Sequence, residues 1–275
     1  MTRLPFFATL QDAFRQFWRN RRDFFAFAYL PVTANALLGV ALQASLPQPL
    51  PNDAGALISS LTGLTIGIWI VSIVATVGFY VVFALAWHRL CLLPGETTTV
   101  GAALRWRARH WRFFTATFAL AFAVILLAFV ANLAVGPLIA ALFGAQSGAG
   151  ALIPIVLSFI IITMAMRFLL LFPAIAVDDR SMTPAESWRR TRGNGAALFM
   201  LLFTVSLGVA IVHQLIVAAW AAALGPMAVD GSLLAVFALM LLVQCLTFIG
   251  VALTTTIVSI AYRDLTAQAG GSGTV

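Results

Sequence analysis

The chain has 275 residues, of which 62% are hydrophobic and only 9% are charged. An ordinary soluble domain carries about 25% charged residues, so this chain has too few charges to cover a water-exposed surface. The composition therefore excludes a soluble globular domain and indicates an integral membrane protein. All 16 basic residues are arginine. The two cysteines, Cys91 and Cys245, provide neither a disulfide framework nor the spacing of a metal site.

Six stretches are long and apolar enough to cross about 30 Å of hydrocarbon, which needs about 20 residues of helix. In chain order they are 24–44, 57–87, 113–143, 151–177, 196–224 and 233–262. We therefore predict an all-α integral membrane domain of six transmembrane helices over residues 24–262. Residues 1–23 are predicted to form a cytoplasmic amphipathic helix, and residues 263–275 a flexible cytoplasmic tail that is rich in Gly, Ser and Thr.

The arginines are distributed on one side of the predicted spans. Fifteen of the 16 lie before the first span, between the second and third, between the fourth and fifth, or after the sixth. The other three connections contain no arginine, and their only charges are Asp53 and Asp230. The positive-inside rule then predicts that both termini are cytoplasmic, in a multi-pass protein of the bacterial inner membrane.

Similar segments precede the three odd-numbered spans and begin at Thr9, Thr99 and Thr183. In each, a small residue follows the threonine by four positions, and a large apolar residue and an arginine come next. The third segment has a good helix start, with Thr183 as a cap and Glu186 as its capping-box partner, and Thr9 with Asp12 is a weaker version. We predict a threefold repeat of an interfacial amphipathic helix followed by a membrane hairpin. The alternative is that any basic helix before a span has this character.

The sequence resembles a known family in one region. Residues 167–177 read Arg-Phe-Leu-Leu-Leu-Phe-Pro-Ala-Ile-Ala-Val, and residues 187–194 read Ser-Trp-Arg-Arg-Thr-Arg-Gly-Asn. They resemble the second-half signature of the YciC-like proteins and of the membrane domain attached to some glycerophosphodiester phosphodiesterases. The resemblance implies a six-span bacterial membrane protein without an established activity, and it brings no functional residues. The fused enzymes carry their chemistry in a separate soluble barrel, for which this chain has no room, so a non-enzymatic partner module is implied.

Arginines and tryptophans at the predicted cytoplasmic boundary are the candidates for contact with lipid headgroups, because guanidinium groups attract anionic lipid and indole rings favour the membrane interface. The candidates are Arg15, Arg19, Arg22, Arg105, Arg109, Arg112, Arg167, Arg189, Arg190, Arg192, Trp18, Trp111 and Trp188.

Arg167 differs from the other arginines because it lies inside the fourth predicted span. One interpretation is a structural anchor whose stem stays in the apolar layer while its head reaches water, paired with Asp178 or Asp179. The other is a contact with a phosphate headgroup or a substrate. The residues after it, 168–177, are predicted to be an interfacial or re-entrant segment kinked at Pro173.

Five polar residues inside the spans have two interpretations. They are Asn35, Asn132, His213, Gln214 and Gln244. Hydrogen bonds between helices would satisfy them and contribute about 1 kcal/mol or less each. Alternatively, they line a polar pathway through the bundle.

No common catalytic or nucleotide-binding motif is present in the sequence, and its three histidines are scattered. We expect a non-enzymatic scaffold or accessory module that needs no cofactor and no metal, although a membrane enzyme is not excluded. Its expected partners are anionic membrane lipids and another membrane protein, and not nucleic acid. The alternative function is a transporter or lipid translocator with a pathway between the repeated hairpins.

Overall fold

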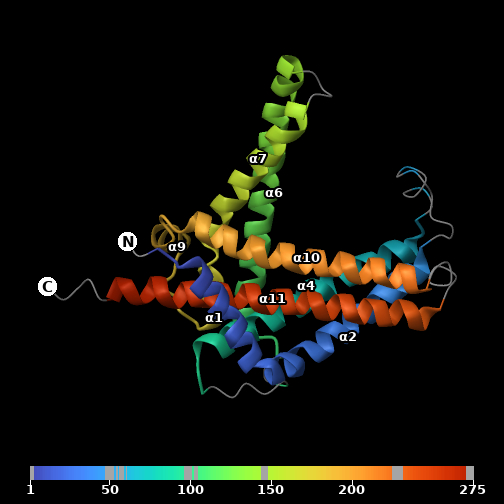
Figure 1. Cartoon of the computed structure of the whole chain (residues 1–275), viewed down its shortest axis with the longest axis horizontal. Coiled ribbons are helices and arrows are strands. Elements are labelled where there is room, and N and C mark those ends of the chain that lie inside the picture. The colour runs from blue at the N-terminus through green and yellow to red at the C-terminus, as the bar shows by residue number, and fades with distance from the viewer. Residues whose placement is uncertain are drawn as a thin grey trace.

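The computed structural model describes residues 3–46, 53, 55, 59, 61–95, 101, 105–143, 148–224 and 232–270. This part of the chain is helical and contains no strand (Figure 1). The helices run as follows: α1 Phe6–Arg19, α2 Arg21–Ser45, α4 Gly63–Leu92, α6 Ala108–Phe143, α7 Gly148–Ala165, the 3-10 turn η1 Met166–Phe168, α8 Leu171–Ala176, α9 Pro184–Arg190, α10 Gly195–Leu224 and α11 Leu233–Gly270.

Six helical segments are long and apolar enough to cross a membrane, as the sequence predicted. They are Arg21–Ser45, Gly63–Leu92, Ala108–Pro137, Leu152–Ala176, Gly195–Ala223 and Leu233–Ala267. The chain is therefore an all-helical membrane protein with six candidate spans. The last helix continues to Gly270, beyond the expected start of the tail, and residues 271–275 lie outside the described part.

The fourth span is broken, and the break begins earlier than the sequence analysis predicted. Helix α7 ends at Ala165, one 3-10 turn follows, and the short helix α8 begins at Leu171. Pro173 lies inside the first turn of α8, where the missing backbone N–H costs nothing. The proline therefore follows the break, and it does not form the kink itself.

Of the two threonines predicted to cap helices, Thr183 does so and Thr9 does not. The Thr183 hydroxyl accepts a hydrogen bond of 3.2 Å from the Glu186 backbone N–H, as an N-cap does. Thr9, by contrast, is buried inside α1, whose N-cap is Pro5, so its predicted role as a helix start is wrong. Thr99 and most of its segment lie outside the described residues, as do the predicted outer-loop residue Asp230 and most of the first outer connection.

Helices α2, α4, α10 and α11 form a four-helix bundle, with α11 packed against each of the other three (Figure 1). Its core is aromatic and centres on Trp87, which is fully buried. The Trp87 ring is stacked on Phe83, with a centroid distance of 5.8 Å, and lies edge-on to Phe24 at 6.0 Å. The indole N–H also donates a hydrogen bond of 2.8 Å to Thr256 on α11. This pair therefore links α4 to α11 at the centre of the bundle.

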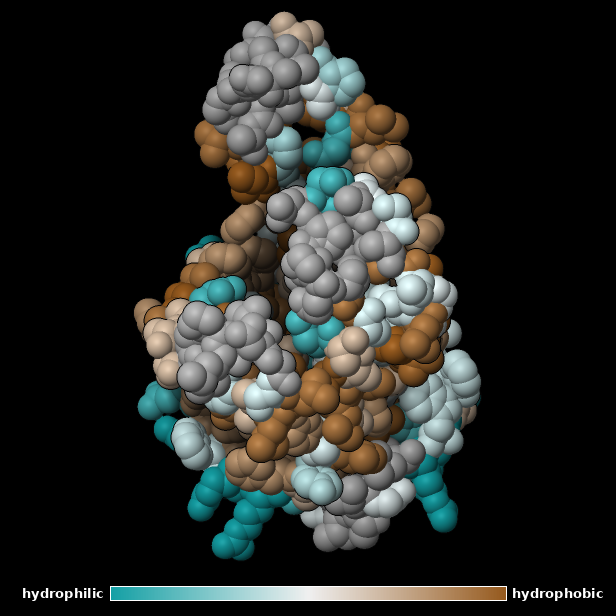
Figure 2. Space-filling model, turned by 90° about the vertical axis from the view of Figure 1, so that its right-hand side faces the viewer, coloured by the Kyte–Doolittle hydropathy of each residue, from teal (hydrophilic) through white to brown (hydrophobic). Residues whose placement is uncertain are grey.

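Helices α6 and α7 pack mainly on each other and project away from the bundle (Figure 1). No residue of α6 between 114 and 137 is buried. Figure 2 shows hydrophobic side chains over much of the projecting hairpin and of the bundle face below it. An apolar surface of this size needs lipid or another apolar partner.

The first and third segments of the predicted repeat share three local features, and the repeat itself stays a prediction. Helices α2 and α10 begin at Arg21 and Gly195, which are separated by the same 174 residues as Thr9 and Thr183. Ala13 and Ser187, which hold the small-residue position, are both fully buried. The next arginine is exposed in both copies and pairs with an acidic residue three positions earlier.

Candidate functional site

The arginine-bearing segments meet at one end of the bundle, which we call the arginine-rich end: α1, the last turns of α4, the start of α6, residues 177–192, and α11 from Ile260 onward. Hydrogen bonds join these segments directly. Gln16 of α1 donates to the Cys91 carbonyl of α4 at 3.4 Å, and Tyr262 of α11 donates to Asp179 at 2.6 Å. The buried Leu4 N–H donates to the Asn194 side chain at 2.9 Å.

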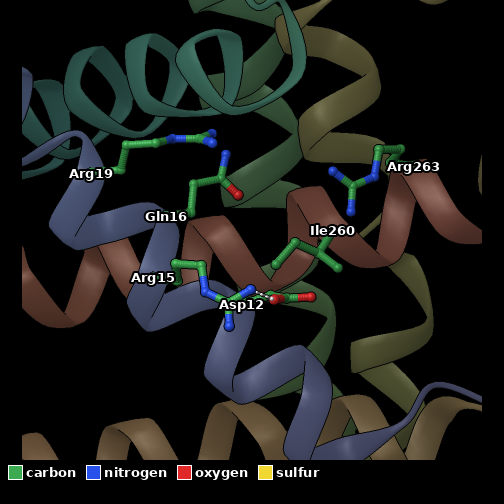
Figure 3. A pocket seen from close by; sticks show the side chains of 6 residues that line it. All are labelled: Asp12, Arg15, Gln16, Arg19, Ile260 and Arg263. Carbon is green, nitrogen blue, oxygen red and sulfur yellow. Dashed lines mark hydrogen bonds and ion pairs between the residues drawn. The ribbon is translucent and has the colours of Figure 1, made fainter.

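A polar cavity of about 210 Å³ lies where α1 crosses α11 (Figure 3). It is lined by Asp12, Arg15, Gln16, Arg19, Ile260 and Arg263. Two of its arginines have carboxylate partners: Arg15 pairs with Asp12 at 3.3 Å, and Arg263 pairs with Asp264 at 3.2 Å. No carboxylate pairs with Arg19 within the described part of the chain. The cavity therefore holds more guanidinium groups than it can neutralise.

Helix periodicity explains why these side chains share one cavity. Residues 12, 15, 16 and 19 have the spacing of one helix face. An adjacent face of α1 buries Thr9, Ala13 and Phe17 and packs on α11, which brings the polar face next to Arg263. Arg15 and Arg19 were predicted, whereas Gln16 and Arg263 were not among the predicted candidates. The same i, i+3, i+4, i+7 spacing would have identified Gln16.

A third face of α1 is aromatic and exposed. Phe7 is 82% exposed and Trp18 is 62% exposed, and Phe14 lies between them on the same face. Phe17, by contrast, points into the bundle core. Large exposed aromatic side chains beside exposed arginines are typical of a helix at a membrane–water interface.

Arg167 does not pair with Asp178 or Asp179, so that prediction is wrong. Its guanidinium lies 3.6 Å from the centre of the Trp188 ring and donates a hydrogen bond of 2.6 Å to the Trp188 carbonyl. Its own carbonyl accepts hydrogen bonds from Ser187 at 2.7 Å and from Thr191 at 3.2 Å. Arg167 therefore attaches α9 to the broken fourth span, which agrees with a structural role.

Asp178 pairs instead with arginines at the start of α6. Its carboxylate contacts Arg112 and lies 3.4 Å from Arg109. The backbone of Asp178 has the left-handed helical conformation, with φ of 60°, at the C-terminal end of α8. The N–H groups of Asp178 and Asp179 close that end by bonding to the Ile175 and Ala174 carbonyls, as in a Schellman motif. Glycine is the usual residue at such a left-handed helix end, and an aspartate there costs backbone free energy. The two ion pairs of Asp178 offset this cost, and they connect α6 to α8.

The remaining boundary candidates lie around this end. Arg189 and Arg190 both pair with Glu186. The Glu186 carboxylate therefore forms ion pairs in place of the bond to the Thr183 backbone N–H that a capping box predicts. The other candidates are exposed side chains: Arg22, Arg105, Arg192 and Trp111.

The five polar residues inside the spans do not form one group. Thr76 donates a hydrogen bond of 3.0 Å to Asn35, which is the predicted bond between helices. Asn132 bonds to Ala128 in its own helix at 2.7 Å. His213 lines a cavity between α10 and α11, and Gln214 is exposed. Within the described residues no hydrogen bond joins Gln214 or Gln244 to another helix, so the prediction for these two and for Asn132 is wrong.

We predict that the carboxylate of Asp179 makes the stability of the arginine-rich end depend on pH in the acid range. Burial alone would raise its pKa, but hydrogen bonds from Ser181 and Tyr262 hold the pKa below its usual value. Because the folded-state pKa is the lower one, the carboxylate stabilises the fold above about pH 4, and this stabilisation is lost as pH falls through the folded pKa. We expect Asp179→Asn to flatten the fall in unfolding free energy below about pH 4, measured by denaturant titration. Asp264→Asn, at a half-buried carboxylate that pairs with Arg263, is the control. An equally steep fall in Asp179→Asn as in the unmodified protein would contradict the assignment.

Comparison of the chain with protein-family models, with curated proteins and with solved structures found no match. The class of protein is therefore defined by the structure alone: an all-helical protein with six candidate membrane spans. No group of three or more residues suited to a metal ion occurs within the described residues. What distinguishes this protein chemically is the concentration of guanidinium and aromatic groups at one end.

Proposed function

We propose that the arginine-rich end binds the headgroups of anionic phospholipids at the cytoplasmic face of a bacterial inner membrane. The observation that carries the proposal is the cavity between α1 and α11, where Arg15, Arg19 and Arg263 converge. A guanidinium group offers several N–H donors in a planar fork that suits phosphate oxygens. An anionic membrane surface also attracts each arginine by about 1 kcal/mol.

The exposed aromatic face of α1 supports this proposal, since it would lie in the headgroup layer while the polar face meets the phosphates. The interfacial helices and the cytoplasmic position of both termini belong to the same proposal. The bundle would then hold the arginine-rich end at the membrane surface, as a scaffold or accessory module for another membrane component. The resemblance to the YciC-like proteins remains a prediction that agrees with a non-enzymatic module.

A transporter with a polar pathway has less support. Asn35 faces α4, Asn132 bonds within α6, and Gln214 is exposed on α10. The alternative needs these residues in one cavity, but Asn35 is buried and the three residues lie on different helices.

The proposal predicts that neutralising the cavity reduces selective retention of anionic lipid. We expect the triple variant Arg15→Gln, Arg19→Gln, Arg263→Gln to weaken phosphatidylglycerol binding at least about tenfold, because the phosphate loses the N–H donors of three guanidinium groups in addition to their long-range attraction. Native mass spectrometry of protein released from nanodiscs of phosphatidylglycerol and phosphatidylcholine measures the retained lipids.

The matched control removes the same charge outside the cavity, at the exposed residues Arg3, Arg107 and Arg180. It should reduce phosphatidylglycerol retention much less than the cavity variant does. Equal effects of the two triple variants would show that the cavity has no special role, and unchanged retention in the cavity variant would refute headgroup binding there.

A further inference from the structure

Two neighbouring cavities on the side of the bundle share part of their lining, and we treat them together as one groove. The first, of about 230 Å³, lies between α4, α6, α8, α10 and α11, and its lining includes His88 and Phe172. The second, of about 320 Å³, lies between α10 and α11, and its lining includes His213. Ser206 and Thr254 line both cavities, so the two spaces meet there. Figure 2 shows a hollow in the surface between the projecting hairpin and the bundle.

The groove runs along the direction in which the spans cross the membrane. Its near end is at the arginine-rich end, where His88 precedes Arg89 and Phe113 follows Arg112. At 1.5 Å per residue, Ser206 lies about 16 Å from the start of α10 and His213 about 27 Å. The groove therefore extends through most of a hydrocarbon layer about 30 Å thick.

Three polar side chains of the groove form hydrogen bonds within the protein. Thr254 donates to the Gly250 carbonyl and Thr247 to the Val243 carbonyl, each at 2.9 Å. His88 shares a hydrogen bond of 2.8 Å with Ser259. These groups offer little to a polar headgroup or to a file of waters, whereas the methyl groups of Val205, Val209 and Val251 offer an apolar wall. The lining thus favours a hydrocarbon occupant.

The side chains around the groove indicate which molecule supplies that hydrocarbon. Phe203, Leu207 and Ile211 are exposed on α10 near the groove, and such side chains at this depth face lipid. We infer that the groove binds one acyl chain of a membrane phospholipid, whose phosphate lies at the arginine-rich end beside Arg112. This inference goes beyond headgroup binding in the α1–α11 cavity, and it uses a different set of lining residues.

A photoreactive lipid tests the inference. The whole protein is placed in nanodiscs of phosphatidylcholine that include phosphatidylcholine with a diazirine in the middle of one chain, irradiated, digested and mapped by mass spectrometry. We expect labelling to concentrate on residues 205–213 and 247–254, above that on the exposed face of α4 at residues 64–74. Ser206→Phe, which fills the junction of the two cavities, should reduce groove labelling to the level on α4.

Ala218→Phe is the matched control, since it adds the same ring to α10 at an exposed position outside the groove lining. It should leave labelling unchanged. Ala210→Phe provides a second variant, which should remove labelling from the outer cavity alone. Groove labelling no higher than that of α4, or equal labelling with and without Ser206→Phe, would overturn the inference, as would cross-links to a second copy of the chain across the groove. Because phosphatidylcholine is zwitterionic, the triple arginine variant should label normally, which separates this result from the test of headgroup binding.

Discussion

Trp87→Ala is expected to destabilise the protein by about 3–5 kcal/mol, the cost typical of removing a fully buried tryptophan from a packed core. The substitution empties the centre of the aromatic cluster between Phe24 and Phe83. It also leaves the Thr256 hydroxyl without the indole N–H that bonds to it. Helix α11 contacts the other three helices of the bundle, so the loss should affect the whole bundle. The measurement is equilibrium unfolding in mixed micelles of denaturing and mild detergent.

Trp87→Phe separates the two contributions to this effect. It keeps an aromatic ring in the core and loses the hydrogen bond, so a loss of about 1–2 kcal/mol is expected, with part of it due to the smaller ring. A loss below about 1 kcal/mol for Trp87→Ala would mean that the core around α4 and α11 is looser than the structure shows.

Ser187→Leu is expected to detach α9 from the broken fourth span. Ser187 is fully buried, and its hydroxyl donates to the Arg167 carbonyl at 2.7 Å. A leucine has no room there, and overpacking typically costs about 1–3 kcal/mol in addition to the lost hydrogen bond. The stacking of Trp188 on Arg167 should be lost with it. Limited trypsin digestion after Arg189, Arg190 and Arg192 should then become faster.

Two variants calibrate this result. Ser187→Ala fits the site and should cost about 1 kcal/mol, because only the hydrogen bond is lost. Ala185→Leu makes a similar increase in size on the exposed side of the same helix, and it should leave the rate of digestion unchanged. If Ser187→Leu were digested no faster than Ala185→Leu, the contact of α9 with Arg167 would not hold this segment in place.

The number and the approximate positions of the spans could be predicted because each is a long apolar run, and no tertiary information is needed to find it. Ala13 and Ser187, the small residues of two predicted repeat segments, are both buried, whereas the repeat itself stays a prediction. The convergence of Arg15 and Arg19 on one face of α1 likewise follows from helix periodicity.

The partners of individual polar groups could not be predicted, since they depend on how helices pack. Arg167 had two carboxylates nearby in sequence, yet Asp178 contacts Arg109 and Arg112 of α6, which lie more than 60 residues earlier. Asp179 is occupied by Tyr262 and Ser181. The projection of α6 and α7 from the bundle could not be predicted either, because their spans are about as hydrophobic as those of α4, α10 and α11.

The orientation of the arginine-rich end is the claim on which the proposed headgroup binding depends. Single cysteines at the exposed positions Arg180 and Ser232, in a chain without Cys91 and Cys245, can be tested with a membrane-impermeant maleimide. We predict that the cysteine at position 232 reacts in intact cells and that the one at position 180 reacts only after permeabilisation. The opposite pattern would place the arginines outside the cytoplasm and contradict the account.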